Sequence, residues 1–273
     1  MRINTCHFIF LDKMKTKSYL IALMCFIFVA CENYDEPEVT IPWYEDTAAL
    51  RADFSRALTD AQSLGESDIS TTLMPIIESN SELEWKVIED KKMVLVCAMM
   101  TQDDLKFWKA TDLFRLSKQT GIWVTIPAEW SHRAKEFEGL DSVASRYRMI
   151  QMLGLTPDTS YDTVVEFYVD PEGLFRPGAD PSISTTTCGF DFPLWADADY
   201  KIGETNFREW FAYQKSMAYI GDYACPWTQL GYTYDWHHGA NKQGLSEYIA
   251  SVQTQALIKV RKGCWTFIKE HNQ

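Results

Sequence analysis

The chain has 273 residues, and its 38 acidic residues outnumber its 26 basic ones, which gives a formal net charge of −12. Such a surface repels nucleic acid, whose binding proteins carry basic patches, so nucleic acid is excluded as a partner. With 46% hydrophobic and 14% aromatic residues the chain can bury a real core, which excludes general disorder.

The first recognisable element is an apolar run, Tyr19–Cys31, which follows three lysines between positions 13 and 17. A basic segment, a short apolar stretch and small residues at its end are the parts of a secretory signal peptide. The run is too short to span a bilayer as a stable helix, which needs about 20 residues. The alternatives are a buried helix and a true membrane anchor. We therefore predict a signal peptide over residues 1–30, with Met14 as the true start.

The end of this run, Val29-Ala30-Cys31, resembles the lipobox of bacterial lipoproteins, although Phe28 stands where Leu is usual. The resemblance implies lipid attachment at Cys31, and acyl chains such as palmitate would then hold the protein at a membrane. The acidic run 32–38 resembles the tethers of lipoproteins that Bacteroidota display on the outer leaflet of the outer membrane, and it also fits a plain solvated linker. The resemblance implies an outer membrane lipoprotein, at the cell surface or on the periplasmic face. Residues 31–46 are the predicted lipidated tether.

Up to residue 169, apolar residues recur first at helical and then at strand spacing. Thr47–Leu64 repeats them at helical spacing, and Gly65 suits the end of a helix. Met93–Met99 and residues 122–126 read as buried strands, and Thr163–Val169, β-branched and aromatic, reads as a central strand. Two further helices are predicted over Pro127–Phe137 and Asp141–Leu153.

Residues 170–203 are rich in Pro, Gly and Asp and are predicted to form a long loop, either functional or a simple surface excursion. A helix over Thr205–Ile220 and an alternating strand over Gln229–His237 follow. Three more strands are expected to complete an antiparallel meander: Leu245–Val252, Ala256–Val260 and Cys264–Ile268. The order predicts a single α+β domain over residues 47–273, with a central, mostly antiparallel sheet and several flanking helices.

Four cysteines remain in this predicted domain: Cys97, Cys188, Cys225 and Cys264. In an oxidising compartment they can form two disulfides in any of three pairings, and free buried thiols are an equal alternative. None stands at C-x-x-C spacing, so no zinc or redox site is predicted from them.

The leading candidates for chemistry follow the last aromatic strand. Asp235 and His237 are expected to point the same way, as an oriented general base or as two metal ligands, while His238 points with the aromatic residues. A turn sequence follows at once, so exposed turn histidines are the simpler alternative. Glu166 is a further candidate, because a carboxylate on a central strand can be desolvated.

Candidate ligand-binding residues also lie in the C-terminal half. Arg176 can present its guanidinium to a carboxylate, phosphate or sugar hydroxyl, or it can pair with Asp180 and fasten the loop. Trp227 and Trp236 can offer flat apolar platforms to a sugar ring, or they can belong to the core.

The segments Leu174–Ile183 and Pro226–Trp236 resemble stretches of secreted bacterial proteins that have no assigned activity. The resemblance implies one recurring C-terminal module and assigns no role to a residue. The motifs of serine hydrolases, zinc proteases, P-loop proteins and dinucleotide-binding proteins are absent from the sequence, and no cofactor or metal is predicted.

The leading hypothesis is a lipoprotein that binds an extracellular glycan or protein. The alternative is a secreted hydrolase that uses Asp235 and His237 with acidic residues of the 170–203 loop, with or without a metal ion. A structural or assembly lipoprotein is the third hypothesis, and it predicts no pocket and a flat apolar patch.

Overall fold

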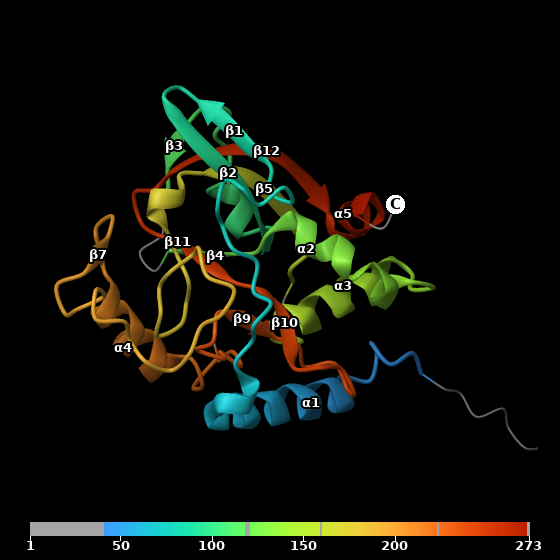
Figure 1. Cartoon of the computed structure of the whole chain (residues 1–273). Coiled ribbons are helices and arrows are strands. Elements are labelled where there is room, and N and C mark those ends of the chain that lie inside the picture. The colour runs from blue at the N-terminus through green and yellow to red at the C-terminus, as the bar shows by residue number, and fades with distance from the viewer. Residues whose placement is uncertain (1–40, 118–120, 159, 223, 272–273) are drawn as a thin grey trace, which may run out of the picture. The chain divides into compact units, whose positions relative to one another are not determined.

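The computed structural model describes residues 41–117, 121–158, 160–222 and 224–271, which belong to one compact unit, Ile41–Gln273 (Figure 1). The predicted signal peptide, Cys31 and most of the predicted tether lie outside the described residues. The unit has the predicted α+β fold, with helices around a largely antiparallel sheet. Within the described ranges, no helix is both long and apolar enough to cross a membrane.

A five-stranded antiparallel sheet forms the centre of the domain. Its strand order is β1 (Trp85–Ile88), β2 (Lys91–Met100), β5 (Thr163–Val169), β12 (Gln255–Gly263) and β3 (Phe114–Arg115). β5 is the middle strand, as its β-branched and aromatic residues predicted. β12 has a β-bulge at Lys259, because Ile258 pairs with Phe167 whereas Val260 pairs with Glu166.

One face of this sheet packs on a second, three-stranded sheet. That sheet has the order β4 (Ile122–Val124), β11 (Tyr248–Ala250) and β6 (Leu174–Phe175). Beyond β4, the backbone of Thr125 exchanges two hydrogen bonds of 2.9 Å with Cys97 of β2, which joins the two sheets at one edge. Alternate residues of β2 and β5 point into the shared core, in keeping with the period of two along a strand: Val94, Val96, Ala98, Val165, Phe167 and Val169.

Helices α2 (Pro127–His132), α3 (Ser142–Met152) and α5 (Cys264–His271) cover the other face (Figure 1). α2 begins with a proline. Proline suits the first helical position, because a backbone N–H there would have no partner within the helix and its absence costs nothing. Asp141 caps α3 by accepting hydrogen bonds from two backbone amides of its first turn. The indole of Trp130 on α2 packs edge-on against Phe267 of α5, with the ring centroids 5.6 Å apart.

The prediction of a strand at Cys264–Ile268 is wrong, because these residues begin α5. Cys264, Phe267 and Ile268 are the buried residues of this helix, and their spacing of i, i+3 and i+4 matches one helical face. The segment therefore covers the sheet instead of extending it.

Two smaller groups of elements complete the domain. α1 (Thr47–Asp60), capped by Asp46, packs near the hairpin of β9 (Tyr232–Tyr234) and β10 (Gln243–Ser246), with Phe54 against Trp236. α4 (Phe207–Met217) follows the two-stranded pair β7 (Lys201–Ile202) and β8 (Thr205–Asn206). The predicted strand over 229–237 is thus limited to β9, and the predicted strand over 245–252 is divided between β10 and β11.

The four cysteines of the domain are free thiols, so the disulfide alternative is wrong. Cys188 and Cys225 belong to separate hydrophobic clusters, and Cys97 and Cys264 lie in a third. Burial raises the pKa of the Cys97 thiol to about 12, which keeps it protonated.

Candidate functional site

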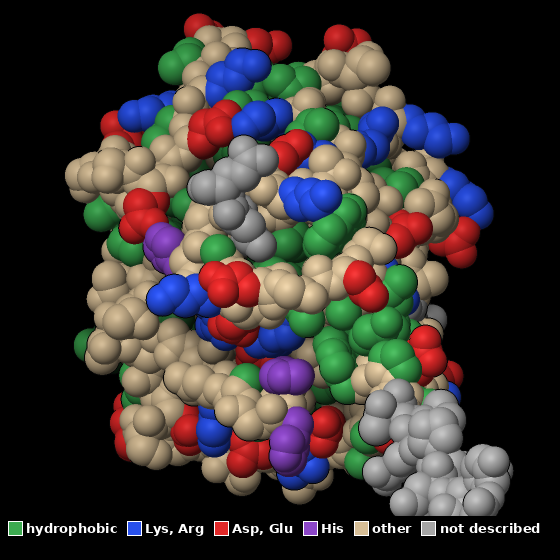
Figure 2. Space-filling view, turned by 90° about the vertical axis from the view of Figure 1, so that its right-hand side faces the viewer, with side chains coloured by type: hydrophobic (Ala, Val, Ile, Leu, Met, Phe, Trp, Pro, Cys, Tyr) green, Lys and Arg blue, Asp and Glu red, His purple; other side chains and the backbone are tan. Residues whose placement is uncertain are grey.

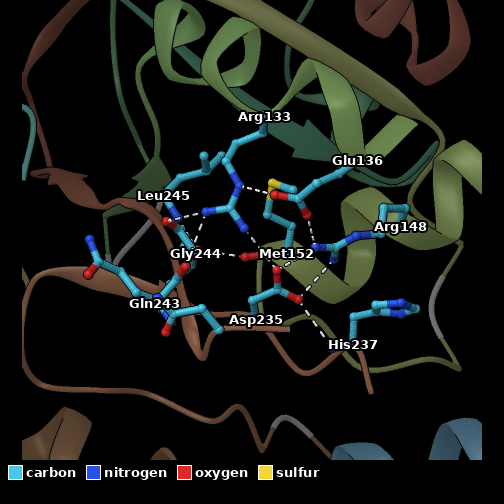
Figure 3. A network of polar contacts seen from close by, with 11 residues as sticks. Arg133, Glu136, Arg148, Met152, Asp235, His237, Gln243, Gly244 and Leu245 are labelled. Carbon is cyan, nitrogen blue, oxygen red and sulfur yellow. Dashed lines mark hydrogen bonds and ion pairs between the residues drawn. The ribbon is translucent and has the colours of Figure 1, made fainter. Parts of the chain in front are cut away.

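Asp235 follows β9 and lies in a buried network of charges (Figure 3). Arg148 of α3 binds it through two hydrogen bonds, Nη1 to Oδ1 at 2.9 Å and Nη2 to Oδ2 at 2.5 Å. Arg133, directly after α2, adds a third from Nη2 at 3.2 Å. The backbone N–H of His237 supplies a fourth at 3.1 Å. Both oxygens of this carboxylate are therefore fully engaged by the protein itself.

A second carboxylate, Glu136, balances the charges of this network. It binds Nε of Arg133 with one oxygen and Nη2 of Arg148 with the other (Figure 3). Arg133 also donates from Nη1 to the backbone oxygens of Gln243 and Gly244, at 3.2 and 3.3 Å, which fastens β10. Two arginines and two carboxylates thus tie α2, α3, β9 and β10 together, and the arrangement acts as a structural clamp.

The two histidines beside this network do not form a catalytic pair with Asp235. Burial and the nearby Arg148 lower the pKa of His237, so its imidazole is neutral, and its ring packs edge-on against Trp43. The His237 Nδ1 is buried and has no hydrogen-bond partner. His238 is exposed and lies near Arg56. The prediction that Asp235 orients His237 as a general base is wrong, because the Asp235 carboxylate binds the backbone N–H of His237 and not its imidazole ring. No group of three or more potential metal ligands occurs among the described residues.

Arg176 fastens the 170–203 loop, but it does so through backbone groups. It is fully buried, donates from Nε to the Ser182 oxygen at 3.0 Å and from Nη2 to the Thr185 oxygen at 2.8 Å, and stacks over Tyr248. Asp180 instead accepts from the backbone N–H of Ser182 at 2.9 Å. The two residues therefore stabilise one loop separately.

The two tryptophans proposed as a sugar platform are buried, each with 3% of its surface exposed. Trp227 donates from Nε1 to the Pro177 oxygen at 3.0 Å, and Trp236 donates to the Leu155 oxygen at 2.9 Å. The expectation of an exposed aromatic platform is wrong, because these rings pack in the core and their single donors are already bound.

Glu166 is desolvated, as expected from its place on β5, and it has a cationic partner. Its carboxylate lies 2.7 Å from Nζ of Lys262, which also pairs with Glu270 of α5. These side chains line a cleft of about 360 Å³ beside α5. Figure 2 shows the face on which α2, α3 and α5 lie, and basic and acidic side chains alternate across it. The negative charge of Glu166 is paired with the positive charge of Lys262.

A second pocket, of about 390 Å³, lies between α2 and the segment 72–82. Glu129 of α2 lines it, and its Oε1 accepts two hydrogen bonds from Ser246 of β10, from the backbone N–H at 3.1 Å and from Oγ at 2.8 Å. Its Oε2 is buried and has no hydrogen-bond partner. Burial raises the pKa of the Glu129 carboxyl to about 7, although the Ser246 hydrogen bonds and the charges of His132 and Arg176 oppose the rise.

Two further features surround this carboxyl group. His132, one turn along α2, pairs through Nε2 with Oε2 of Glu82 at 2.6 Å, and both residues line the same pocket. Arg176, close enough to influence Glu129, has an Nη1 that is buried without a partner. An acid with one free oxygen, a second carboxylate and an imidazole therefore share one pocket.

Glu129 was not among the sequence candidates. The sequence pattern that could have indicated it is an acidic residue between Ile126 and Trp130, both of which are buried in the structure. Its partner Ser246 lies 117 residues away, so the pattern near Glu129 alone could not reveal the site.

Comparisons with protein-family models, with curated proteins and with solved structures find no match, so the functional argument rests on the residues of this chain alone.

Proposed function

We propose that the protein is an outer membrane lipoprotein, at the cell surface or on the periplasmic face, whose domain binds an extracellular ligand. The lipid anchor is proposed at Cys31, on the strength of the lipobox-like sequence. We propose that the ligand is a glycan. A protein ligand is the alternative that the sequence suggested.

The observation that carries the binding proposal is the free, buried Oε2 of Glu129 beside a pocket of about 390 Å³. A buried polar atom without a partner costs free energy, and a ligand hydroxyl that forms a hydrogen bond with it would recover that cost. The same pocket is lined by the neutral polar residues Ser79 and Thr186 and by the apolar residues Leu73 and Pro75. A few placed polar groups on an apolar wall are typical of small-ligand sites, and a sugar presents hydroxyls and C–H groups that match both.

Glycan binding is tested with the purified protein and a panel of mono- and oligosaccharides, by calorimetry and ligand-observed NMR. We expect the wild type to bind at least one sugar, and Glu129→Ala to weaken that binding at least tenfold. Glu78→Gln is the matched control, because Glu78 lies in the same segment but its exposed side chain pairs with Lys92 at 2.9 Å. Absence of sugar binding, or an equal loss in both variants, would contradict the proposal.

The anchor is tested by the substitution Cys31→Ser in cells fed with labelled palmitate. We expect the wild type to be labelled and to fractionate with the outer membrane, and the variant to be unlabelled and released. Labelling that persists in the variant would place the lipid elsewhere. Protease treatment of intact cells then separates the cell surface from the periplasmic face.

The hydrolase centred on Asp235 and His237 gains no support, because Asp235 is held by two arginines and His237 is neutral and half-buried. If the domain binds no sugar, a protein becomes the favoured ligand.

A further inference from the structure

The pocket at Glu129 contains two carboxyl groups in contrasting surroundings. Glu129 is covered, with Oε1 held by Ser246 and Oε2 free. Glu82 lines the same pocket, with 44% of its side chain exposed, and His132 holds one of its oxygens at 2.6 Å. Pairs of acidic groups whose environments differ in this way can take different protonation states at one pH.

The remaining residues of the pocket restrict the chemistry that such a pair can perform. The described residues that line it include no Lys or Arg, so the pocket offers no clamp for a phosphate or sulfate group. It also presents no thiol, and the hydroxyl of Ser246 is buried and already engaged with Glu129 and the backbone N–H of Met74. Two carboxyl groups and water are nevertheless sufficient to hydrolyse a glycosidic bond.

We propose that this pocket is a catalytic site for glycoside hydrolysis, in which Glu129 is the general acid and Glu82 is the general base. The inference rests on the proposed glycan binding and extends it from recognition to reaction. The burial that raises the pKa of Glu129 to about 7 supports the assignment, because a general acid must hold its proton at neutral pH.

The proposed step consumes one water molecule and needs no other reactant. Glu82 takes a proton from the water, whose oxygen forms a bond to the anomeric carbon. The bond from that carbon to the leaving oxygen breaks, and its electron pair stays on the oxygen, which receives the proton of Glu129. Glu129 ends as the carboxylate and Glu82 as the acid, and one proton passes back through solvent. His132 and Ser246 are positioning residues, because each holds one oxygen of a carboxyl group and leaves the other free.

The leaving group provides the sharpest test of the acid. Wild-type protein is assayed with aryl glycosides of the sugars that bind, with 4-methoxyphenol and with 2,4-dinitrophenol as leaving groups. We expect kcat/KM for the methoxyphenyl glycosides to decline above about pH 7, as Glu129 loses its proton. Glu129→Gln should lose at least about 100-fold on these substrates, because a general acid contributes roughly 100- to 10,000-fold. It should lose far less on dinitrophenyl glycosides, whose leaving group needs no proton.

The base is tested with Glu82→Ala, which should lose activity toward both leaving groups. Added azide should restore turnover of the dinitrophenyl glycosides, because azide attacks the anomeric carbon without a base and yields a glycosyl azide. Glu78→Gln serves again as the control and should keep the wild-type rates and pH profile.

The outcomes separate the two proposals. Sugar binding by wild type without hydrolysis of any bound glycoside overturns the catalytic inference and leaves the binding proposal intact. Absence of binding and of hydrolysis overturns both. An equal loss of Glu129→Gln on both leaving groups contradicts the acid role. If that variant fails to fold, a wild-type pH profile that lacks the decline above about pH 7 contradicts it instead.

Discussion

Two acidic side chains with buried oxygen atoms, Asp235 and Glu129, lie beside the same short strand β10 and differ in what surrounds them. Asp235 accepts four hydrogen bonds, three of them from arginine side chains, and none of its capacity is left for a ligand. Glu129 accepts two from Ser246, and its second oxygen has no partner. Burial of an acid is therefore a poor guide to function by itself. The free oxygen is what separates a candidate site from a structural clamp.

The two carboxylates are also linked through α2. Glu129 lies on this helix, and Arg133, which binds Asp235, follows it directly. Arg133 holds the backbone of β10 at residues 243 and 244, while Ser246 of the same strand holds Glu129. The clamp therefore fixes α2, which lines the pocket, and β10, whose Ser246 holds Glu129, and no residue of the clamp lines the pocket itself.

The largest effect is expected from Asp235→Asn, which removes one of the two negative charges that pair with the buried Arg148. Loss of one partner of a buried ion pair costs roughly 3–5 kcal/mol, so the free energy of unfolding in urea should fall by that amount. Asp158→Asn is the matched control, because Asp158 pairs with Arg51 at 2.9 Å on the surface, and an exposed pair contributes about 1 kcal/mol or less. Similar losses in the two variants would contradict the clamp.

Glu129→Gln should alter how stability depends on pH. The wild-type carboxyl has a folded-state pKa of about 7 against an ordinary value of 4.5. Below the ordinary value both states are protonated, whereas above about pH 7 the folded state must hold a buried carboxylate. The free energy of unfolding should therefore decrease by about 3 kcal/mol between these pH values because of this group. The free energy of unfolding in urea is measured for both proteins between about pH 4.5 and pH 7. The value for the wild type minus the value for the variant should show that decrease. A difference that stays constant with pH would show that Glu129 titrates normally.

Gly231→Ala probes the packing around Arg176, whose charge acts on Glu129. Gly231 has a φ of +75°, and a Cβ there would overlap the Arg176 side chain. Gly239 has a φ of +78° with nothing within 4 Å of such a Cβ, so Gly239→Ala measures the backbone strain alone, about 1 kcal/mol. Overpacking should make Gly231→Ala costlier by a further 1–3 kcal/mol or so in thermal unfolding. Equal losses would mean that Arg176 moves aside freely.

The sequence predicted the elements whose signal is local. The periodicity of α1, α3, β2 and β5 is carried by their own residues, and the α+β class followed from their order. The short strands β1 and β3 were missed, because a strand of two to four residues depends on its partner for stability.

The candidate site was the least predictable part. Glu166 is desolvated, as its place on a central strand indicated, whereas Asp235 was chosen as a general base and is held by arginines instead. The partners of both carboxylates could not be inferred, because Arg148 lies 87 residues from Asp235 and Lys262 is on another strand. Aromatic residues in the pattern of 227–236 fit a surface platform and a core equally well, and packing against other elements decided between the two. Pockets form between distant segments, so only the fold brings Glu129 and Glu82 together.

The free thiols of the domain have a consequence for how it must be made. A thiol reacts as its thiolate, and burial raises the pKa of Cys188 to about 11 and that of Cys225 to about 12, so both are inert once the chain has folded. Before the chain has folded, they have no such protection. In the proposed location outside the cytoplasm, folding of the exported chain therefore competes in time with oxidation of its thiols, and the order of events matters as much as the final free energy. A variant that folds slowly would accumulate wrongly linked chains even if its native state were as stable as the wild type.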